Sequence, residues 1–350
     1  MADDALRDDA AVTTAGWAGF AVGTIVGTAL LWGVARPLAG EGSIGVPAAV
    51  VVAVLAAVAF AVSTVRHRHA ETVPMPGWQA AMSRLSDVCV GLATAGVSAL
   101  GVLCAGEVLA AGLDGLEVPA VGGGLLTGIA SAAAGSGAYA LGMRLRTRDL
   151  VALLFAFVVA GTLFSMLTAT DPRWWERNFS QLGAGDSAWA FNGTLVIAGL
   201  LLATLGSYVG RDLHRLLGDD AIGRIGWVVV LFALAGLALA GVGAFPLHRA
   251  EAAHNVCAFA ALGLLAVVAV ATTAIVPGRP RSLRWTTAGV AVGLAGAVLL
   301  WRPLAIYSAT ALEAVAAGLA LVWLSSLLRT LAALAPDEAR PSGRAHLRAR

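Results

Sequence analysis

The stretch DPRWWERNFSQLGAGDSAWAFNG, residues 171–193, interrupts two long hydrophobic segments and shows how this chain must fold. Before it, residues 150–168 read LVALLFAFVVAGTLFSMLT, and after it residues 188–209 read AWAFNGTLVIAGLLLATLGSYV. Each flanking segment has about the 20 apolar residues that a helix needs to cross a bilayer. The pattern therefore predicts two transmembrane helices joined by a polar loop.

The rest of the chain repeats this pattern. Its 350 residues are 59% hydrophobic and 13% charged, whereas an ordinary soluble domain carries about 25% charged residues. A chain this long can hide so much apolar surface only in lipid. We therefore predict an all-α bundle of ten transmembrane helices. The predicted spans are residues 15–34, 46–65, 88–112, 118–142, 150–168, 188–209, 225–245, 254–276, 286–301 and 304–328.

The arginines predict how the spans are oriented. All 23 Lys and Arg residues are Arg, and 18 of them fall on one side if the N-terminus is cytoplasmic. The five on the other side are Arg36, Arg173, Arg177, Arg249 and Arg302. Cytoplasmic loops of membrane proteins carry such an excess, so both termini are predicted to be cytoplasmic. The formal net charge of only +2 gives no reason to expect a nucleic-acid partner.

The ends of the chain differ from its middle. Residues 1–14 are acidic and lack the basic region of a signal peptide, which predicts a cytoplasmic tail before an uncleaved first helix. Residues 15–142 are predicted to form a four-helix membrane region. Residues 331–350 are basic and polar, which predicts a disordered tail. Glycines at every fourth position, such as Gly19, Gly23 and Gly27, predict close helix contacts.

The polar stretch has helix signals of its own. Asp171 can cap a helix, Pro172 suits a first helical position, and Trp175, Phe179 and Leu182 share one face. These features predict a short amphipathic helix at residues 172–182 on the outer surface. The alternative is a lid over a polar pocket, with Asn178, Ser180 and Asp186 facing inward.

Three later segments resemble a known family. They are NFSQLG (178–183), AFNGTLVIAGLLL (190–202) and GVGAFPLHRAEAAHN (241–255), and Glu313 fits the same pattern. They resemble the bacterial and archaeal membrane-protein family catalogued as domain of unknown function 998, whose pattern implies a six-helix core at residues 150–330. Relatives often carry Asp where this chain has Gln181. That family is distantly similar to the Frag/DRAM/Sfk-like membrane proteins, which are associated with lipid and GPI-anchor handling. The resemblance implies a prokaryotic cell membrane but brings no catalytic residue.

Polar side chains gather on the predicted outer side. An ionisable group near the bilayer centre costs about 2.5 kcal/mol or more, so it usually faces a partner or water. Glu313 is predicted to lie some nine residues into the last span. We predict an outward-facing polar pocket. Its predicted lining residues are Asn178, Ser180, Asp186, Asn192, His254, Asn255, Glu107 and Glu313.

Each of these residues also has a structural explanation. Glu313 can be buried beside an Arg, and Glu107 can extend outward to the surface. His254 and Asn255 can satisfy backbone groups where Pro246 breaks the preceding helix. Asn192 can form a hydrogen bond between helices. These alternatives stay open from sequence alone.

Several functions fit such a pocket. Binding of a lipid or other amphiphile requires only the pocket and is our main expectation, with membrane lipids as partners. A hydrolase or transferase acting on a lipid headgroup would use Glu313 and His254 as acid and base, or a metal. A transporter is the third alternative.

We expect no cofactor and no metal. His248, Glu251 and His254 are weak metal candidates, because at offsets of 0, 3 and 6 they spread too far around a helix. Cys89, Cys104 and Cys257 all lie in apolar segments, which predicts packing rather than disulfides. The sequence gives neither the ligand nor the oligomeric state.

Overall fold

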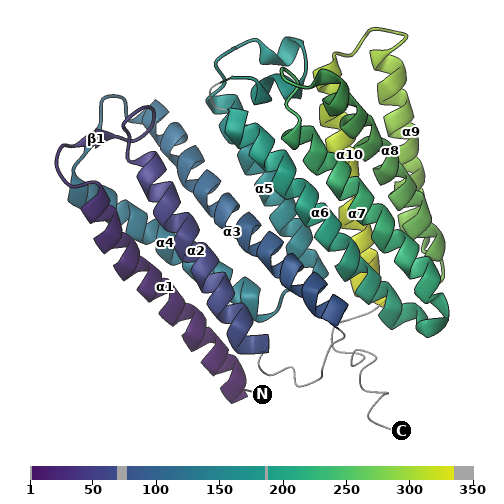
Figure 1. The fold of residues 1–350 in the computed structure, drawn as a ribbon, viewed down its shortest axis with the longest axis horizontal. Helices are drawn as coiled ribbons and strands as arrows, with labels where there is room; N and C mark the ends of the chain where they lie inside the picture. Colours follow the sequence, from purple (N-terminus) through teal and green to yellow (C-terminus); the bar gives the residue numbers. More distant parts are fainter. Residues whose placement is uncertain (1, 69–76, 186–187, 335–350) are drawn as a thin grey trace. The chain divides into compact units, whose positions relative to one another are not determined.

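The computed structural model describes residues 2–68, 77–185 and 188–334, and this part of the chain is almost entirely helical (Figure 1). The prediction of an all-α membrane bundle is confirmed, because each predicted span corresponds to one long helix. The ten helices of the described part are α1 (Ala2–Leu30), α2 (Gly45–Arg68), α3 (Gly77–Gly112), α4 (Ala120–Met143), α5 (Thr147–Leu167), α6 (Ala188–Leu217), α7 (Ile222–Ala244), α8 (Glu251–Ile275), α9 (Arg281–Trp301) and α10 (Ala309–Leu334).

Nine of these helices, within the described residues, are long and apolar enough to cross a membrane. The remaining helix is α4, which reads AVGGGLLTGIASAAAGSGAYALGM and consists largely of Gly, Ala and Ser. It packs against both α1 and α2. Small residues let helix backbones approach closely. The Gly, Ala and Ser residues of α4 therefore allow close packing but make the helix less apolar, by hydropathy, than the other nine.

Two predicted helix starts differ from the structure. Helix α1 begins at Ala2 rather than at residue 15, so the acidic N-terminal residues continue the helix. Helix α10 begins at Ala309 rather than at residue 304, because residues 302–308 form the turn after α9. Glu313 is therefore the fifth residue of α10 and not the tenth of a span. At 1.5 Å per residue it lies about 6 Å along the helix.

The described chain forms two compact units. The N-terminal unit contains residues up to 145 together with residues 156–167, and the C-terminal unit contains residues 146–155 and those from 168 onward. In the N-terminal unit the predicted glycine contacts join α1 to α4. A Cβ on Gly23 would lie 2.5 Å from Ser131 Oγ, and one on Gly19 would lie 2.6 Å from Ser131 O. The short strands β1 (Arg36–Pro37) and β2 (Glu117–Val118) pair antiparallel in the same unit.

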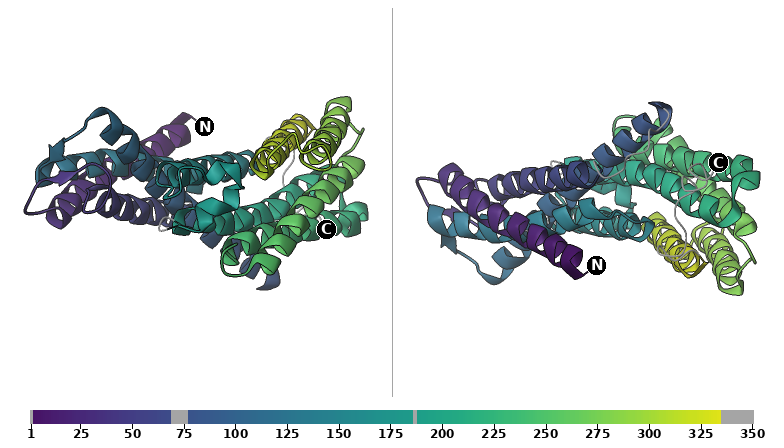
Figure 2. Two further views of the ribbon diagram at one scale, coloured as in Figure 1. Left: turned by 90° about the horizontal axis from the view of Figure 1, so that it is seen from above. Right: turned by 90° about the horizontal axis from the view of Figure 1, so that it is seen from below.

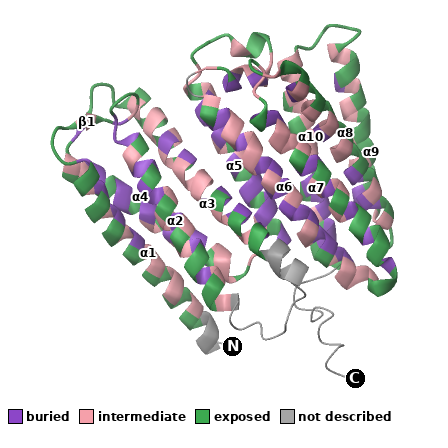
Figure 3. Cartoon of the chain, in the orientation of Figure 1, coloured by how far each residue is buried: buried purple, intermediate pink, exposed green. Residues whose placement is uncertain are grey.

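The C-terminal unit is built on close packing of α6 against α7. Gly199 and Gly236 face each other so closely that a Cβ on either would meet the backbone of the other helix. Gly243, near the end of α7, lies in the same way against the carbonyl oxygen of Asn192 on α6. Figure 3 shows buried residues concentrated along α6 and α7, whereas α9 is mostly exposed. This pairing places the last turn of α7 beside the first turns of α6.

The other helices of this unit follow in sequence order. Helix α8 packs on α7, and α9 packs on α10, which lies beside it in both views of Figure 2. Hydroxyl groups join α8, α9 and α10: the Oγ1 atoms of Thr273 and Thr287 are 2.7 Å apart, and Trp323 Nε1 donates to Thr287 Oγ1 at 3.1 Å. Such bonds are the usual polar contacts between helices in lipid.

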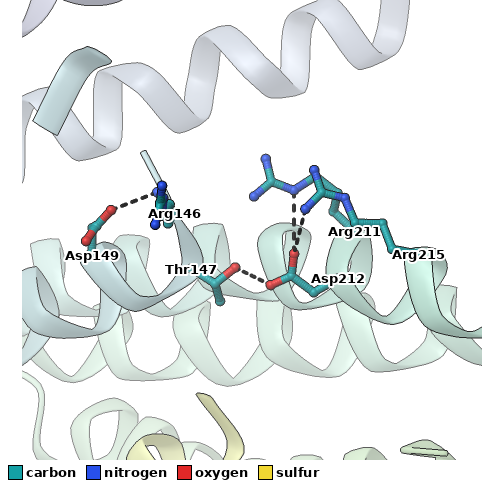
Figure 4. Close-up of polar contacts among 6 residues, drawn as sticks. All are labelled: Arg146, Thr147, Asp149, Arg211, Asp212 and Arg215. Atoms are coloured by element: carbon teal, nitrogen blue, oxygen red, sulfur yellow. Dashed lines mark hydrogen bonds and ion pairs between the residues drawn. The ribbon is translucent and has the colours of Figure 1, made fainter. Parts of the chain in front are cut away.

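The two ends of the C-terminal unit carry different polar groups. At one end Thr147 donates to Asp212, and the other carboxylate oxygen of Asp212 lies 3.7 Å from Arg215 Nη1 and 3.8 Å from Arg211 Nε (Figure 4). Asp149 accepts a hydrogen bond from the backbone N–H of Arg146 and so caps the start of α5. We call the opposite end the cap end. It comprises the α5–α6 segment and the α7–α8 and α9–α10 turns.

Candidate functional site

The segment between α5 and α6 covers the cap end with two short turns of 3-10 helix. They are η1 (Trp174–Glu176) and η2 (Phe179–Gly183). The prediction of one amphipathic helix at 172–182 is therefore wrong. Asn178 is extended, with φ −167° and ψ 164°, and it separates the two turns. Near the start predicted for that helix, Asp171 Oδ1 accepts a hydrogen bond from the backbone N–H of Arg173 at 2.9 Å.

Side chains of α10 explain why the helix is interrupted. In a continuous α-helix the N–H of Phe179 would donate to the carbonyl of Trp175. Instead, Phe179 N–H donates to the carboxylate of Glu313 at 2.6 Å, and the Trp175 carbonyl accepts the hydroxyl of Thr310 at 2.7 Å. Both partners of that helical bond are occupied by α10. The bonds to Glu313 and Thr310 together fix the loop in its non-helical form.

Asn192 on α6 holds the end of the same loop. Its Nδ2 donates to the carbonyl oxygen of Gly183 at 3.0 Å. A Cβ on Gly183 would collide with Asn192 Oδ1, so a glycine is required by this close approach. The backbone does not require this glycine, since Gly183 is not among the residues with positive φ in the described chain.

His254 on α8 holds the middle of the loop. Its Nε2 lies 2.8 Å from Ser180 Oγ, while its Nδ1 lies 3.0 Å from the carbonyl oxygen of Val242 and 2.9 Å from that of Phe245. A carbonyl can only accept, so Nδ1 must carry the ring proton. In neutral histidine Nε2 then accepts the Ser180 hydroxyl. Both side chains are enclosed, because His254 is 3% and Ser180 8% exposed.

Pro246 explains why two backbone carbonyls are free to orient His254. The carbonyl of Val242 would normally pair with the N–H four residues later, but Pro246 has none. The carbonyl of Phe245 also lacks its usual partner, since the N–H groups of Arg249 and Ala250 both donate to Pro246. The sequence PLHRA after α7 thus turns the chain into α8 and leaves two acceptors for the imidazole.

The pairing of Ser180 with His254 allows proton transfer between the two side chains. The lone pair of His254 Nε2 points at the Ser180 hydroxyl, so the imidazole can accept its proton. The carbonyls that hold Nδ1 belong to the C-terminal end of α7, which carries partial negative charge. That end can stabilise a protonated imidazole, a task that serine hydrolases assign to a carboxylate. Glu313, the carboxylate of this cluster, is bonded to the neighbouring residue Phe179 instead.

A shallow hollow opens at the α9–α10 turn of the same end. It has a volume of about 630 Å³ and is lined by Trp301, Arg302, Pro303 and Ala305. The guanidinium of Arg302 lies over the Trp301 ring, 5.4 Å from its centre. The residues after it are strongly exposed, with Leu304 at 58% and Ile306 at 67%. The turn therefore presents apolar side chains and one cation together.

The structure distributes the other predicted pocket residues differently. Asn178 belongs to the loop, and its side-chain oxygen is buried with no partner among the described residues. Asn255, one residue after His254, is exposed. Glu107 belongs to the N-terminal unit. Asp186 lies outside the described residues. The contacts around the loop thus unite Ser180 with His254, Glu313 with Phe179, and Asn192 with Gly183.

The weak metal candidates do not come together. Helix α8 begins at Glu251, so His248 precedes it and the helical offsets assumed for these residues do not apply. His248 and Glu251 are exposed, and His248 accepts a hydrogen bond from Arg249. Both ring nitrogens of His254 are engaged by protein groups. Within the described ranges no three His, Cys, Asp or Glu residues are grouped to hold a metal ion.

One feature of the site was missed from sequence. Thr310 was not singled out, although it lies three residues before Glu313 and therefore on the same face of α10. The structural alternative for His254, that it satisfies backbone groups where Pro246 breaks the preceding helix, agrees with its bonds to the carbonyls of Val242 and Phe245.

The helices define the class of this protein, a multi-pass α-helical membrane protein. Its family follows from comparison: residues 150–330 match the model of the family described as "Protein of unknown function (DUF998)", and the chain belongs to that family. The match covers the segments that carry Ser180, His254 and Glu313. Searches of curated proteins and of solved structures gave no match.

Proposed function

We propose that the cap end of the C-terminal unit binds a membrane lipid or another amphiphile with an anionic headgroup. The observation that carries this proposal is the hollow at the α9–α10 turn, with Arg302 held over Trp301. A guanidinium is suited to phosphate or carboxylate because it donates several hydrogen bonds in one plane. The exposed Leu304 and Ile306 beside it can contact acyl chains.

The position of the hollow supports the same function. The α9–α10 turn lies at the end of two candidate spans, where headgroups are found. Thr310 and Glu313, which follow this turn on α10, hold the loop that carries Ser180.

Transport is supported less well. The buried polar side chains between the two ends of the C-terminal unit, such as Thr194 and Thr273, are hydroxyls in the described spans. Thr194 donates to the Ala190 carbonyl of its own helix, and Thr273 pairs with Thr287 between α8 and α9. They are not arranged around the broken helices that transporters use near the bilayer centre.

A photoreactive lipid tests the proposal. The full-length protein in nanodiscs would be irradiated with a diazirine analogue of phosphatidylglycerol, and the labelled peptides mapped by mass spectrometry. We expect labelling within residues 301–308, reduced about fivefold in Arg302→Gln, since one cation near the surface contributes about 1 kcal/mol. Arg224→Gln, an exposed arginine at the other end, should leave that labelling unchanged. Equal labelling of wild type and Arg302→Gln would reject this site.

A further inference from the structure

The pairing of Ser180 with His254 has features that loop anchoring does not require. A single hydrogen bond from Ser180 to any acceptor would hold the loop, yet here the imidazole is fixed in one tautomer by two carbonyls, at 3.0 and 2.9 Å. That tautomer turns a lone pair toward a hydroxyl at 2.8 Å. A nucleophile, a base within hydrogen-bond reach and a third group that orients the base are the parts of a nucleophilic site.

We propose that Ser180 is the nucleophile, and His254 the general base, of an acyl-transfer site that acts on a carboxylic ester of an amphiphile. This inference rests on the proposed binding of an amphiphile at the cap end. It differs from the sequence-based alternative, in which Glu313 and His254 formed the acid–base pair. Glu313 instead positions the backbone of Phe179, the residue before Ser180.

The residues around the pair determine how it would work. The end of α7 takes the place of a carboxylate, because its free carbonyls at Val242 and Phe245 face the ring proton of His254. Ser180 lies in η2, whose start is held by Glu313 and whose end is held by Asn192. The nucleophile is thus fixed by three helices. Catalysis depends on this pre-arrangement of the reacting groups.

The reaction balances without any further group. The oxygen of Ser180 forms a bond to the ester carbonyl carbon, and its proton moves to Nε2 of His254. The bond between that carbon and the alcohol oxygen then breaks, and His254 returns the proton to the departing alcohol. Water, or the hydroxyl of a second amphiphile, attacks the acyl-serine by the same proton route. This step releases the acid or a new ester and restores both residues.

Substrates of this class fit the surroundings. An ester of a lipid lies just below the headgroup, so a headgroup held by Arg302 leaves its ester bonds near the end of the spans. Asn178, two residues before Ser180, keeps a buried side-chain oxygen without a partner among the described residues. An amide there can contact a bound polar group that the protein itself does not satisfy.

A covalent probe tests this chemistry directly. The full-length protein in detergent micelles would be treated with a long-chain alkyl fluorophosphonate, and the modified residue identified by peptide mapping. We expect one adduct, on Ser180, whose formation slows when a long-chain ester is present. His254→Gln should react at least about 100-fold more slowly, since a positioned base contributes about 10²–10⁴. Ser180→Ala should give no adduct.

Two variants serve as controls, because each changes a polar residue away from the pair. Ser326→Ala removes a buried serine of α10 that bonds Thr286, and Asn255→Ala removes the exposed neighbour of His254. Both should react like wild type. Because the adduct is mapped on the wild-type protein, the proposal stays testable even if Ser180→Ala does not fold.

The outcomes separate this inference from the proposed function. Lipid labelling at residues 301–308 without an adduct on Ser180 would overturn the acyl-transfer site and leave lipid binding intact. An adduct on Ser180 that a long-chain ester suppresses, without labelling at 301–308, would support the nucleophile and reject the Arg302 site. An adduct whose rate is unchanged in His254→Gln would overturn the role of His254.

Discussion

Single side chains decide the conformation of the loop at the cap end. Glu313 is separated from Phe179 by 134 positions in the chain, yet its carboxylate takes the backbone N–H that an α-helix would have used locally. Asn192, His254 and Thr310 each form a hydrogen bond to a different residue within 174–183. Glu313, Asn192 and His254 are therefore gathered around one loop, whereas Glu107 belongs to the other unit and Asn255 is exposed.

Gly183 offers a test at the residue scale. In Gly183→Ala the new Cβ collides with Asn192 Oδ1, so we expect the free energy of unfolding to fall by about 1–3 kcal/mol. Thermal unfolding of the detergent-solubilised protein measures this change. Gly193→Ala is the matched control, because a Cβ there meets nothing within 4 Å. It should be neutral or slightly stabilising, as alanine is favoured over glycine in a helix. Similar losses in both variants would contradict the proposed contact.

Glu313 offers a second test. In Glu313→Ala the N–H of Phe179 is left without its partner, which costs about 1–3 kcal/mol for a buried donor. Glu313→Gln keeps an oxygen acceptor at the same position, so its loss should be smaller. Hydrogen exchange followed by mass spectrometry should show faster exchange in peptides covering residues 174–183. If the alanine and glutamine variants exchange alike, the carboxylate does not hold the loop by this bond.

At the scale of helices, small residues determine which elements pair. The glycines of α1 meet Thr127 and Ser131 of α4, while Gly124 and Gly128 of α4 meet Thr28 and Thr24 of α1. The two motifs therefore complement each other within one chain. In α6 and α7 the same principle brings the end of α7 beside the start of α6, and this contact sets where the carbonyls for His254 lie.

Gly128→Leu tests the pairing of α1 with α4. A side chain at this position would collide with Thr24 and with the carbonyl of Phe20, so the helices would have to separate. We expect a clear loss of thermal stability, of several degrees or more, or failure to purify as a single species. Gly137→Leu on the same helix is the control, because a Cβ there meets nothing within 4 Å. Equal tolerance of both changes would show that α4 does not depend on close contact with α1.

For the whole molecule, the decisive question is which side of the membrane the cap end faces. The arginine distribution predicts that it faces outward, since Arg173, Arg177, Arg249 and Arg302 are few compared with the arginines of the opposite loops. A substrate of the proposed site would then come from the outer leaflet. Single cysteines placed near the two ends of α9 can test this predicted orientation.

Cysteine labelling in intact cells checks the orientation. In a chain lacking Cys89, Cys104 and Cys257, we expect Ser308→Cys at the cap end to react with a membrane-impermeant maleimide. Ser282→Cys, at the other end of α9, should react only after the cells are opened. Both serines are exposed. The reverse pattern would place the cap end in the cytoplasm and would move the proposed ester substrate to the inner leaflet.

The sequence by itself determined the parts of this protein that depend on local composition. The length of each apolar segment predicts a helix, and Pro246 and the small residues of α4 mark a turn and a close contact. Membership of the family could likewise be recognised from NFSQLG and the segments that follow it. Hydrophobic transfer adds up residue by residue along a segment, so such features can be read without knowing the fold.

Only the tertiary structure decided the site. The amphipathic spacing of residues 172–182 predicts a helix, but Glu313 and Thr310 compete for its backbone bonds from another part of the chain. The hydroxyl that faces His254 Nε2 belongs to Ser180, 74 positions away in the chain, and is brought there only by the fold. A hydrogen bond between distant segments depends on how the helices meet. Local composition does not contain that information, and so the sequence named several of the right residues without their partners.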